Sequence, residues 1–232
     1  MKEKIKALIQ EFPKTYSEEL GINLKSKKPK EIFKWFLASI LFAHRIPESI
    51  AKKTFKEFEK EGLISSKKIL EAGWDKLVEV LDRGKYVRYD FSTASALLAI
   101  MKQLEVEYGS LENLRKKAKD QKDLERRLKS FFRVGEITVN IFLRELRNLW
   151  KVETLPSRFV IEAAKNLGLV KTRNPEKVLK KLKEVWKKNK VKGKTFVNFE
   201  CALLRLGKNY CLKRRCKICR FSKYCTKKTK AF

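Results

Sequence analysis

Residues 128–141 read LKSFFRVGEITVNI, and this stretch decides the fold. Apolar residues at helical spacing run as far as Phe132 and resume after Gly135, which predicts two helices joined by a tight hairpin with Val134 in its turn. Such a turn leaves the first amides of the second helix without partners inside the helix. These amides suit a phosphate oxygen, either directly or through a bound cation. Many helical hairpins contain a glycine in the turn, so this pattern alone does not define a function.

The rest of the chain shows the same helical periodicity, and alternating strand patterns are scarce. The expected helices cover residues 1–12, 29–44, 47–61, 66–71, 74–81, 92–108, 110–118, 121–132, 136–149, 155–167, 175–189 and 195–206. Residues 84–91 are expected to form a loop, and Gly109, Gly168 and Gly207 are expected to end helices. The loops are short and no sequence repeat is present, so the sequence predicts an all-α protein.

The chain carries 57 Lys and Arg residues against 27 Asp and Glu residues, a formal net charge of +30. The excess is concentrated near the end. From Lys171 onward, 22 basic residues stand against three acidic ones, a net of +19 that leaves +11 for the longer remainder. This predicts a polyanionic partner, with nucleic acid as the first expectation. The alternative, a Lys- and Glu-rich surface of a heat-adapted protein, explains a high total charge but not so large an imbalance of sign.

The length of 232 residues and the hydrophobic content of 43% allow one large domain or two small ones around a proper core. The start, MKEKIKALIQEF, is charged throughout and lacks the apolar core of a secretion signal. The longest apolar stretch, residues 35–43, is too short to span a bilayer. We therefore expect a cytoplasmic protein that does not enter a membrane and whose cysteines are reduced.

Four cysteines lie within 15 residues near the C-terminus, at Cys211, Cys216, Cys219 and Cys225. Thiolates are soft donors, and four of them on short loops can enclose one metal centre. Structural zinc usually has two separated C-x2-C pairs, whereas this run has one such pair between longer arms. The spacing favours a [4Fe–4S] cluster, with zinc, and free thiols or disulfides, as alternatives. Cys201 lies outside the run on a helical stretch and is expected to be buried.

Taken together, these segments resemble the endonuclease III superfamily of helix-hairpin-helix DNA glycosylases. Residues 132–140 resemble its hairpin, usually written L-P-G-V-G-x-K-T-A-N, and residues 152–158 resemble its V-D-T-x-x-x-R motif. The cysteine run resembles its cluster loop, C-x6-C-x2-C-x5-C. Residues 40–44 lie where the family has L-L-S-A-Q, and residues 84–90 followed by Ala94 resemble its G-x-Y-x-x-x-A loop. The match covers almost the whole chain in order.

The resemblance implies two helical domains around a DNA-binding cleft. Residues 25–149 would form a helical barrel that ends in the helix-hairpin-helix, and residues 1–24 with 150–232 would form the iron–sulfur cluster domain. It also implies a monomeric enzyme of base excision repair that acts on double-stranded DNA. Such a DNA glycosylase flips a damaged or mispaired base out of the duplex and hydrolyses its N-glycosidic bond.

Glu153 stands where the family has its catalytic aspartate, which implies that it stabilises the oxocarbenium-like transition state and helps to activate water. The alternative is that Glu153 caps the following helix, which Pro156 would help to start. Ile137 occupies the position of the family's lyase lysine, so a monofunctional glycosylase is expected. The other possibilities are a bifunctional glycosylase/AP lyase and a non-catalytic protein that binds a lesion or DNA structure.

The expected DNA contacts lie in the hairpin, at the family's gap-filling position and in the basic cysteine loop: Val134, Gly135, Ile137, Thr138, His44, Arg214 and Arg215. Tyr86, Tyr89 and Asp90 are the expected residues of the base pocket. The two tyrosines could instead belong to the core, and Asp90 could cap the helix that follows. His44 could be an ordinary polar residue at a helix end.

Overall fold

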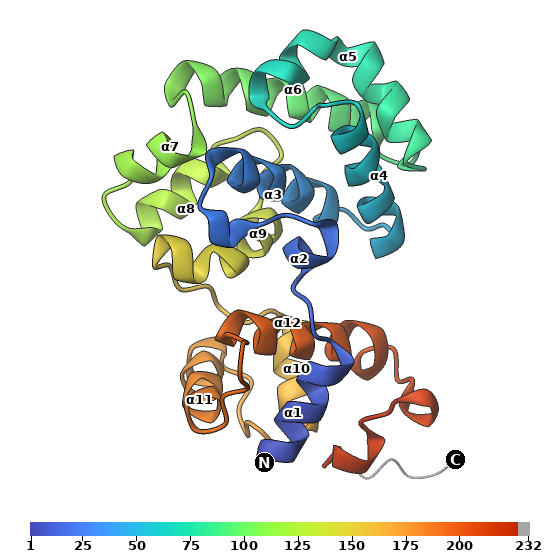
Figure 1. Cartoon of the computed structure of the whole chain (residues 1–232), viewed down its shortest axis with the longest axis vertical. Helices are drawn as coiled ribbons and strands as arrows, with labels where there is room; N and C mark the ends of the chain where they lie inside the picture. Colours follow the sequence, from blue (N-terminus) through green and yellow to red (C-terminus); the bar gives the residue numbers. More distant parts are fainter. Residues whose placement is uncertain (227–232) are drawn as a thin grey trace. The chain divides into compact units, whose positions relative to one another are not determined.

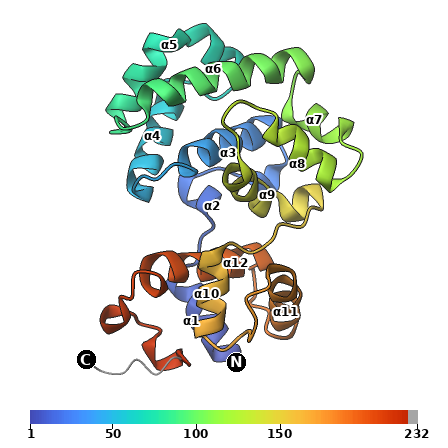
Figure 2. The ribbon, with the colours of Figure 1, turned by 180° about the vertical axis from the view of Figure 1, so that it is seen from behind.

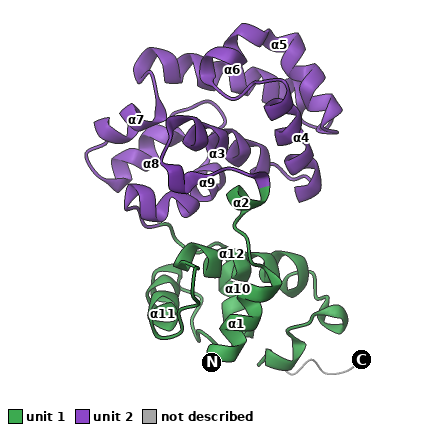
Figure 3. Ribbon diagram, viewed as in Figure 1, with its two compact units in different colours: residues 1–19, 154–232 green, residues 20–153 purple. Residues whose placement is uncertain are grey.

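The computed structural model describes residues 1–226, and every regular element in them is a helix or a helical turn (Figure 1). The prediction of an all-α protein is therefore confirmed for this part of the chain. No helix among these residues is long and apolar enough to cross a membrane. The chain divides into two compact units (Figure 3). Unit 1 comprises Met1–Glu19 and the chain from Thr154 onward, and unit 2 comprises Leu20–Glu153.

Unit 2 contains α3 (Pro29–Phe42), α4 (Glu48–Lys60), α5 (Ser66–Arg83), α6 (Asp90–Glu107), α7 (Leu111–Lys117), α8 (Gln121–Lys129) and α9 (Glu136–Trp150). Nine residues of α3 are buried, because apolar side chains surround this helix instead of forming one stripe. Trp35 on α3 donates a hydrogen bond from Nε1 to the carbonyl oxygen of Phe142 at 3.0 Å, and the ring of Phe36 lies 5.1 Å from that of Phe142. These contacts fix α9 against the core of the unit.

Unit 1 contains α1 (Lys2–Glu11), α10 (Arg158–Asn166), α11 (Pro175–Lys188) and α12 (Phe196–Leu206), and the short α2 (Tyr16–Leu20) lies at its boundary. Helix α12 is almost wholly buried, and α1, α10 and α11 pack on it (Figure 2). Beyond α12 the chain forms a π-helical turn, Gly207–Cys211, and two 3-10 turns, Cys216–Ile218 and Ser222–Tyr224. The clustered cysteines lie in or beside these turns.

The predicted helices agree with the structure in most places. Helix α6 begins at Asp90 instead of residue 92, α8 ends at Lys129 instead of residue 132, and the start of α10 also differs. Helix α10 begins at Arg158, although the helix was expected from residue 155. Leu155 precedes Pro156, and the proline ring disfavours helical backbone in the residue before it. Ser157 is the N-cap, with extended backbone at φ −66° and ψ 162°. The helix therefore starts only after the proline.

Two glycines organise the helices in different ways. Gly73 has φ 72° and ψ 177° inside α5, so the break predicted between 66–71 and 74–81 is present. Gly207 is the C-cap of α12, as expected, and its φ of −62° is helical. A Cβ on Gly207 would lie 2.0 Å from the carbonyl oxygen of Phe159, so glycine is needed there for the close approach of α10.

Candidate functional site

The hairpin between α8 and α9 is anchored by two buried side chains, Phe131 and Val134, and by a hydrogen bond from Val134 N to Phe131 O at 3.0 Å. Arg133 has a φ of 60°, in the left-handed region that glycine adopts most easily. Its side chain is exposed, and Phe132 is 53% exposed. The turn therefore presents an aromatic ring and a guanidinium group to solvent.

The first turn of α9 follows directly. Gly135 is the N-cap and has no side chain with which to cap the helix, and a Cβ placed on it would meet nothing within 4 Å. Ile137 is 66% exposed, whereas Thr138 and Val134 are buried. Among the predicted hairpin contacts, Gly135 and Ile137 are thus open to solvent. The amides at this end of α9 lie at the positive end of the helix dipole, which favours an anion.

An aromatic cluster lies near this turn. The ring of His44, just beyond α3, is 4.8 Å from that of Tyr89 and 5.9 Å from that of Tyr86. Tyr86 is only 1% exposed and donates its hydroxyl hydrogen to the carbonyl oxygen of Leu41 at 2.8 Å, so it is a core residue. His44 and Tyr89 are half-buried. Burial and the positive charge of Arg133 lower the pKa of His44, so its imidazole is neutral at neutral pH.

Asp90 does not cap a helix that starts at Ser92. Helix α6 already begins at Asp90, its N-cap is Tyr89, and the Asp90 carboxylate accepts a hydrogen bond from the adjacent Phe91 N at 2.6 Å. Desolvation and a hydrogen bond to Asp90 raise the pKa of Asp82. The carboxyl group of Asp90, a predicted residue of the base pocket, therefore neighbours that of Asp82.

Glu153 follows α9, and two hydrogen bonds with the side chain of Gln121 fix its backbone. Its N–H donates to Gln121 Oε1 at 2.7 Å, and Gln121 Nε2 donates to its carbonyl oxygen. The Glu153 side chain is 51% exposed, and its Oε2 lies 3.7 Å from Nη1 of the buried Arg147. Because Ser157 caps α10 and that helix begins at Arg158, the alternative in which Glu153 is the helix cap is wrong.

Glu153 lies beyond the C-terminal end of α9, whereas the hairpin lies at the N-terminal end of this helix. Arg147, its ionic partner, is ten residues beyond Ile137, which corresponds to about 15 Å along the helix axis. Glu153 therefore lies near the last turns of α9 and the first residue of α8. His44, Tyr89 and Arg133 gather near the opposite end of α9.

Sequence reasoning missed Gln121, Arg147 and Asp82. Gln121 directly follows Asp120, the N-cap of α8, and so had the pattern of an ordinary first-turn residue. Arg147 lies on a helix whose apolar periodicity gave no sign that a charged residue would be buried there. The pairing of Asp82 with Asp90 joins two elements, and no local signal identifies it.

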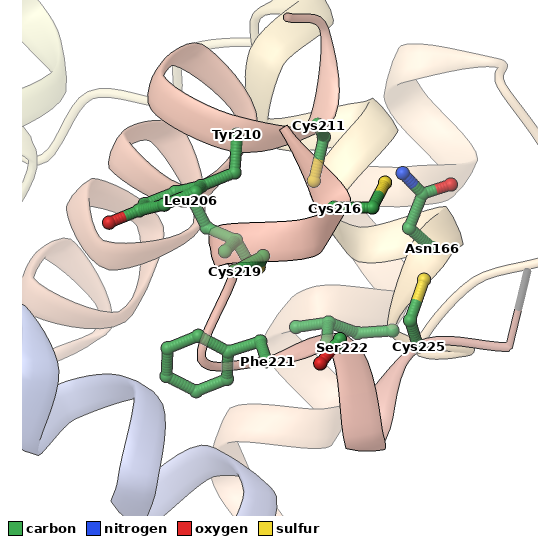
Figure 4. Close-up of a pocket in the computed structure, with 10 residues that line it drawn as sticks. Asn166, Leu206, Tyr210, Cys211, Cys216, Cys219, Phe221, Ser222 and Cys225 are labelled. Carbon is green, nitrogen blue, oxygen red and sulfur yellow. The ribbon is translucent and has the colours of Figure 1, made fainter. Parts of the chain in front are cut away.

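The four clustered cysteines line one pocket of about 40 Å³ in unit 1, which Figure 4 shows. In that view the sulfur atoms of Cys211, Cys216 and Cys225 point toward a shared space. The other lining residues are Asn166, Leu167, Leu206, Tyr210, Phe221 and Ser222. The volume exceeds the space that one water-sized atom needs. Soft sulfur donors of this kind suit either zinc or an iron–sulfur cluster.

All five cysteines are free, and Cys201 is fully buried, as expected. Burial, opposed by a hydrogen bond to Asn166, raises the pKa of the Cys211 thiol to about 11, and burial also raises the pKa of Cys219. The charges of neighbouring cysteines add to both shifts, so the thiols lie close enough to interact. Within residues 1–226, no three His, Cys, Asp or Glu side chains are already closed around a space for one metal ion.

The cysteine loop carries exposed basic residues. Arg214 and Arg215 are both exposed, and Arg214 has a left-handed φ of 53°. Phe221 is buried, and its ring stacks on that of Phe12 at 6.4 Å, which ties the loop to the segment after α1. The loop thus has an apolar anchor and a cationic outer face.

No model of a known protein family matches the chain, and no curated protein matches it. The resemblance to helix-hairpin-helix glycosylases therefore rests on the quoted motifs alone. The assignment of residues 25–149 to a barrel domain and of 1–24 with 150–232 to an iron–sulfur domain stays a prediction.

Proposed function

We propose that this chain is a monomeric DNA glycosylase of base excision repair. It would bind double-stranded DNA through the α8–α9 hairpin and the cysteine loop, and hydrolyse the N-glycosidic bond of a flipped base. The observation that carries the proposal is the hairpin: an uncapped helix N-terminus, an exposed guanidinium and a half-buried aromatic pair lie together there. This combination favours the binding of a backbone phosphate and of a flipped base at neighbouring positions.

The binding step follows from charge. The amides of α9 behind Gly135 would bind a phosphate oxygen, and the exposed Lys129 and Arg133 flank that position. Ile137 would contact the sugar or backbone through its exposed apolar surface. Tyr89 and the neutral His44 could stack on an extruded base without the cost of desolvating a charge. Arg214 and Arg215 would add phosphate contacts from unit 1.

The chemical step in this proposal uses a carboxylate and water. Glu153 would stabilise positive charge as it develops on the sugar and would direct the attacking water. Gln121 fixes its backbone, and Arg147 lies within ion-pair distance of the carboxylate. Ile137 has no nucleophile, so this site would not form an imine with the sugar, and the abasic strand would stay intact.

The donor set and the apolar lining of the cysteine pocket are compatible with a [4Fe–4S] cluster. Cys211, Cys216, Cys219 and Cys225 would hold it. Such a cluster would cross-link the loop after α12, and it takes no part in the proposed hydrolysis. Its contribution would be to keep Arg214 facing DNA.

A second candidate is a non-catalytic protein that binds a lesion or DNA structure. The separation of Glu153 from the hairpin by about 15 Å along α9 favours it. In this reading the ion pair with Arg147 serves only to neutralise a buried guanidinium. The hairpin, the aromatic pair and the basic loop would keep their roles.

A panel of duplexes, each with one damaged or mispaired base, separates the two candidates. The glycosylase should release at least one base and leave an abasic strand that breaks only when heated with alkali. Glu153→Gln should lower release by orders of magnitude with duplex affinity unchanged. Glu71→Gln, which also removes an exposed ion-paired carboxylate, is the matched control and should act like the wild type. Tight binding of a lesion with no base release from any duplex would support the second candidate.

A further inference from the structure

The most basic surface outside the proposed site is formed by residues 171–194, which we call the α11 surface. It contains eleven Lys and Arg residues but only two acidic ones, Glu176 and Glu184. One face of α11 is buried through Val178, Leu179, Leu182, Val185 and Trp186. The other face is exposed and carries Lys177, Lys180, Lys181, Lys183, Lys187 and Lys188.

Acidic neighbours offset part of this charge. Lys181 pairs with Glu184 at 3.2 Å, and Arg173 pairs with Glu162 at 2.9 Å. Lys177 and Lys188 are eleven residues apart, so six lysines repel one another over about 16 Å of helix. A DNA duplex presents about ten phosphate charges over the same length. The surface is therefore opposite in sign to a duplex and carries about three-fifths of its charge density.

The buried face of α11 decides between two polyanionic partners. A helix that lies on an anionic membrane inserts apolar side chains between the lipids. The apolar side chains of α11 are used inside unit 1, where Leu182 is fully buried and Trp186 is 7% exposed. The exposed side chains of α11 are six lysines and two glutamates, with no apolar side chain among them, and this favours a nucleic acid over a lipid surface.

The α11 surface is separate from the cysteine loop within unit 1. Helix α11 packs on α12, whereas the turn Gly207–Cys211 packs on α10 and on the other end of α12. Figures 1 and 2 both show α11 and the cysteine loop on opposite sides of α10. Unit 1 thus carries two basic surfaces with its own core between them.

We propose that the α11 surface binds the phosphate backbone of a second duplex segment while the hairpin and the cysteine loop hold the first. The inference rests on the proposed DNA binding but not on the proposed hydrolysis. Lysine contacts to phosphate carry no sequence information, so the second segment would be any duplex. The protein would bridge two duplexes, or two distant parts of one molecule.

The test uses an undamaged duplex fixed to beads, a free fluorescent duplex, and protein at a concentration below that of the fixed duplex. Wild-type protein should retain the fluorescent duplex on the beads. The triple variant K177Q/K180Q/K187Q should not, because each lost phosphate contact weakens binding about fivefold at 0.15 M salt, or roughly a hundredfold for three. The variant K53Q/K60Q/K67Q removes the same charge from exposed lysines of unit 2 and should bridge like the wild type.

Binding to one duplex is measured in parallel for each variant. The α11 variant should keep its affinity for a single duplex within about threefold, whereas R214Q/R215Q should lose it. The proposal is overturned if the wild type does not bridge, if the α11 variant bridges equally well, or if it loses single-duplex affinity as R214Q/R215Q does. Binding of the wild type to phosphatidylserine vesicles in preference to a second duplex would also overturn it. None of these results depends on base release, so they are independent of the glycosylase assay.

Discussion

Replacing Gly207 by alanine should destabilise unit 1 and disturb the cysteine pocket together. The added Cβ would lie 2.0 Å from the carbonyl oxygen of Phe159 and 2.6 Å from its carbonyl carbon. The two Phe159 atoms that the new methyl group would meet belong to the backbone of α10, so they cannot rotate away as a side chain could. Overpacking of this kind costs about 1–3 kcal/mol, and the rigid contact favours the upper end. For a unit of roughly 100 residues this corresponds to a fall in Tm of about 10–25 °C.

Differential scanning calorimetry measures this effect, and the iron content of the same preparation reports on the pocket. Gly135→Ala is the matched control, since its backbone φ of −99° suits alanine and nothing lies within 4 Å of the new methyl group. It should leave the Tm unchanged within about 2 °C. A Gly207→Ala protein with the Tm and iron content of the wild type would show that α10 and the π-helical turn are not held in close contact.

Four further outcomes are expected. Protein purified without oxygen should be brown with about four irons per chain, and Cys219→Ser should lose the colour, whereas stoichiometric zinc without iron would contradict the cluster. Affinity for undamaged duplex should fall steeply with salt, and charge reversal at Arg214 and Arg215 should flatten the slope; an affinity that does not depend on salt would count against phosphate contact. Because the folded pKa of His44 lies below 6.5, the unfolded state binds this proton first, so stability should fall as pH drops below about 6.5. His44→Gln should remove that part of the slope in urea unfolding at pH 7.5 and 5.5, and an unchanged slope would refute the assignment. Arg133→Gly should raise stability by about 1 kcal/mol by relieving the left-handed backbone, yet weaken duplex binding; a loss of stability would mean that the side chain supports the turn.

The sequence was sufficient where local rules decide the structure. Apolar periodicity identified nearly all of the long helices, and it also predicted 66–71 and 74–81 as separate helices on either side of the break at Gly73. The buried position of Cys201 followed from its helical surroundings. The five residues of α2 carry too little periodicity for such a prediction.

The sequence was insufficient where distant residues meet. Gln121 and Glu153 are 32 residues apart, and nothing near either residue indicates that an amide side chain would bind that backbone. Gly207 was correctly predicted as a helix C-cap, but its close contact with the carbonyl group of Phe159 on another helix has no local signal in the sequence. Contacts between residues that are far apart in the sequence determine more of the candidate site than of the fold.

The discontinuous make-up of unit 1 has a consequence for synthesis on the ribosome. Helix α1 leaves the ribosome long before α12, on which it packs and which ends about 195 residues later. At 5–20 residues per second, α1 waits about 10–40 s for that partner, with Ile5, Leu8 and Ile9 still exposed to solvent. Unit 2 is continuous and can complete its core during this interval. Helix α1 is therefore made well before it can pack in unit 1, and until then its apolar stripe is open to chaperones and to neighbouring nascent chains.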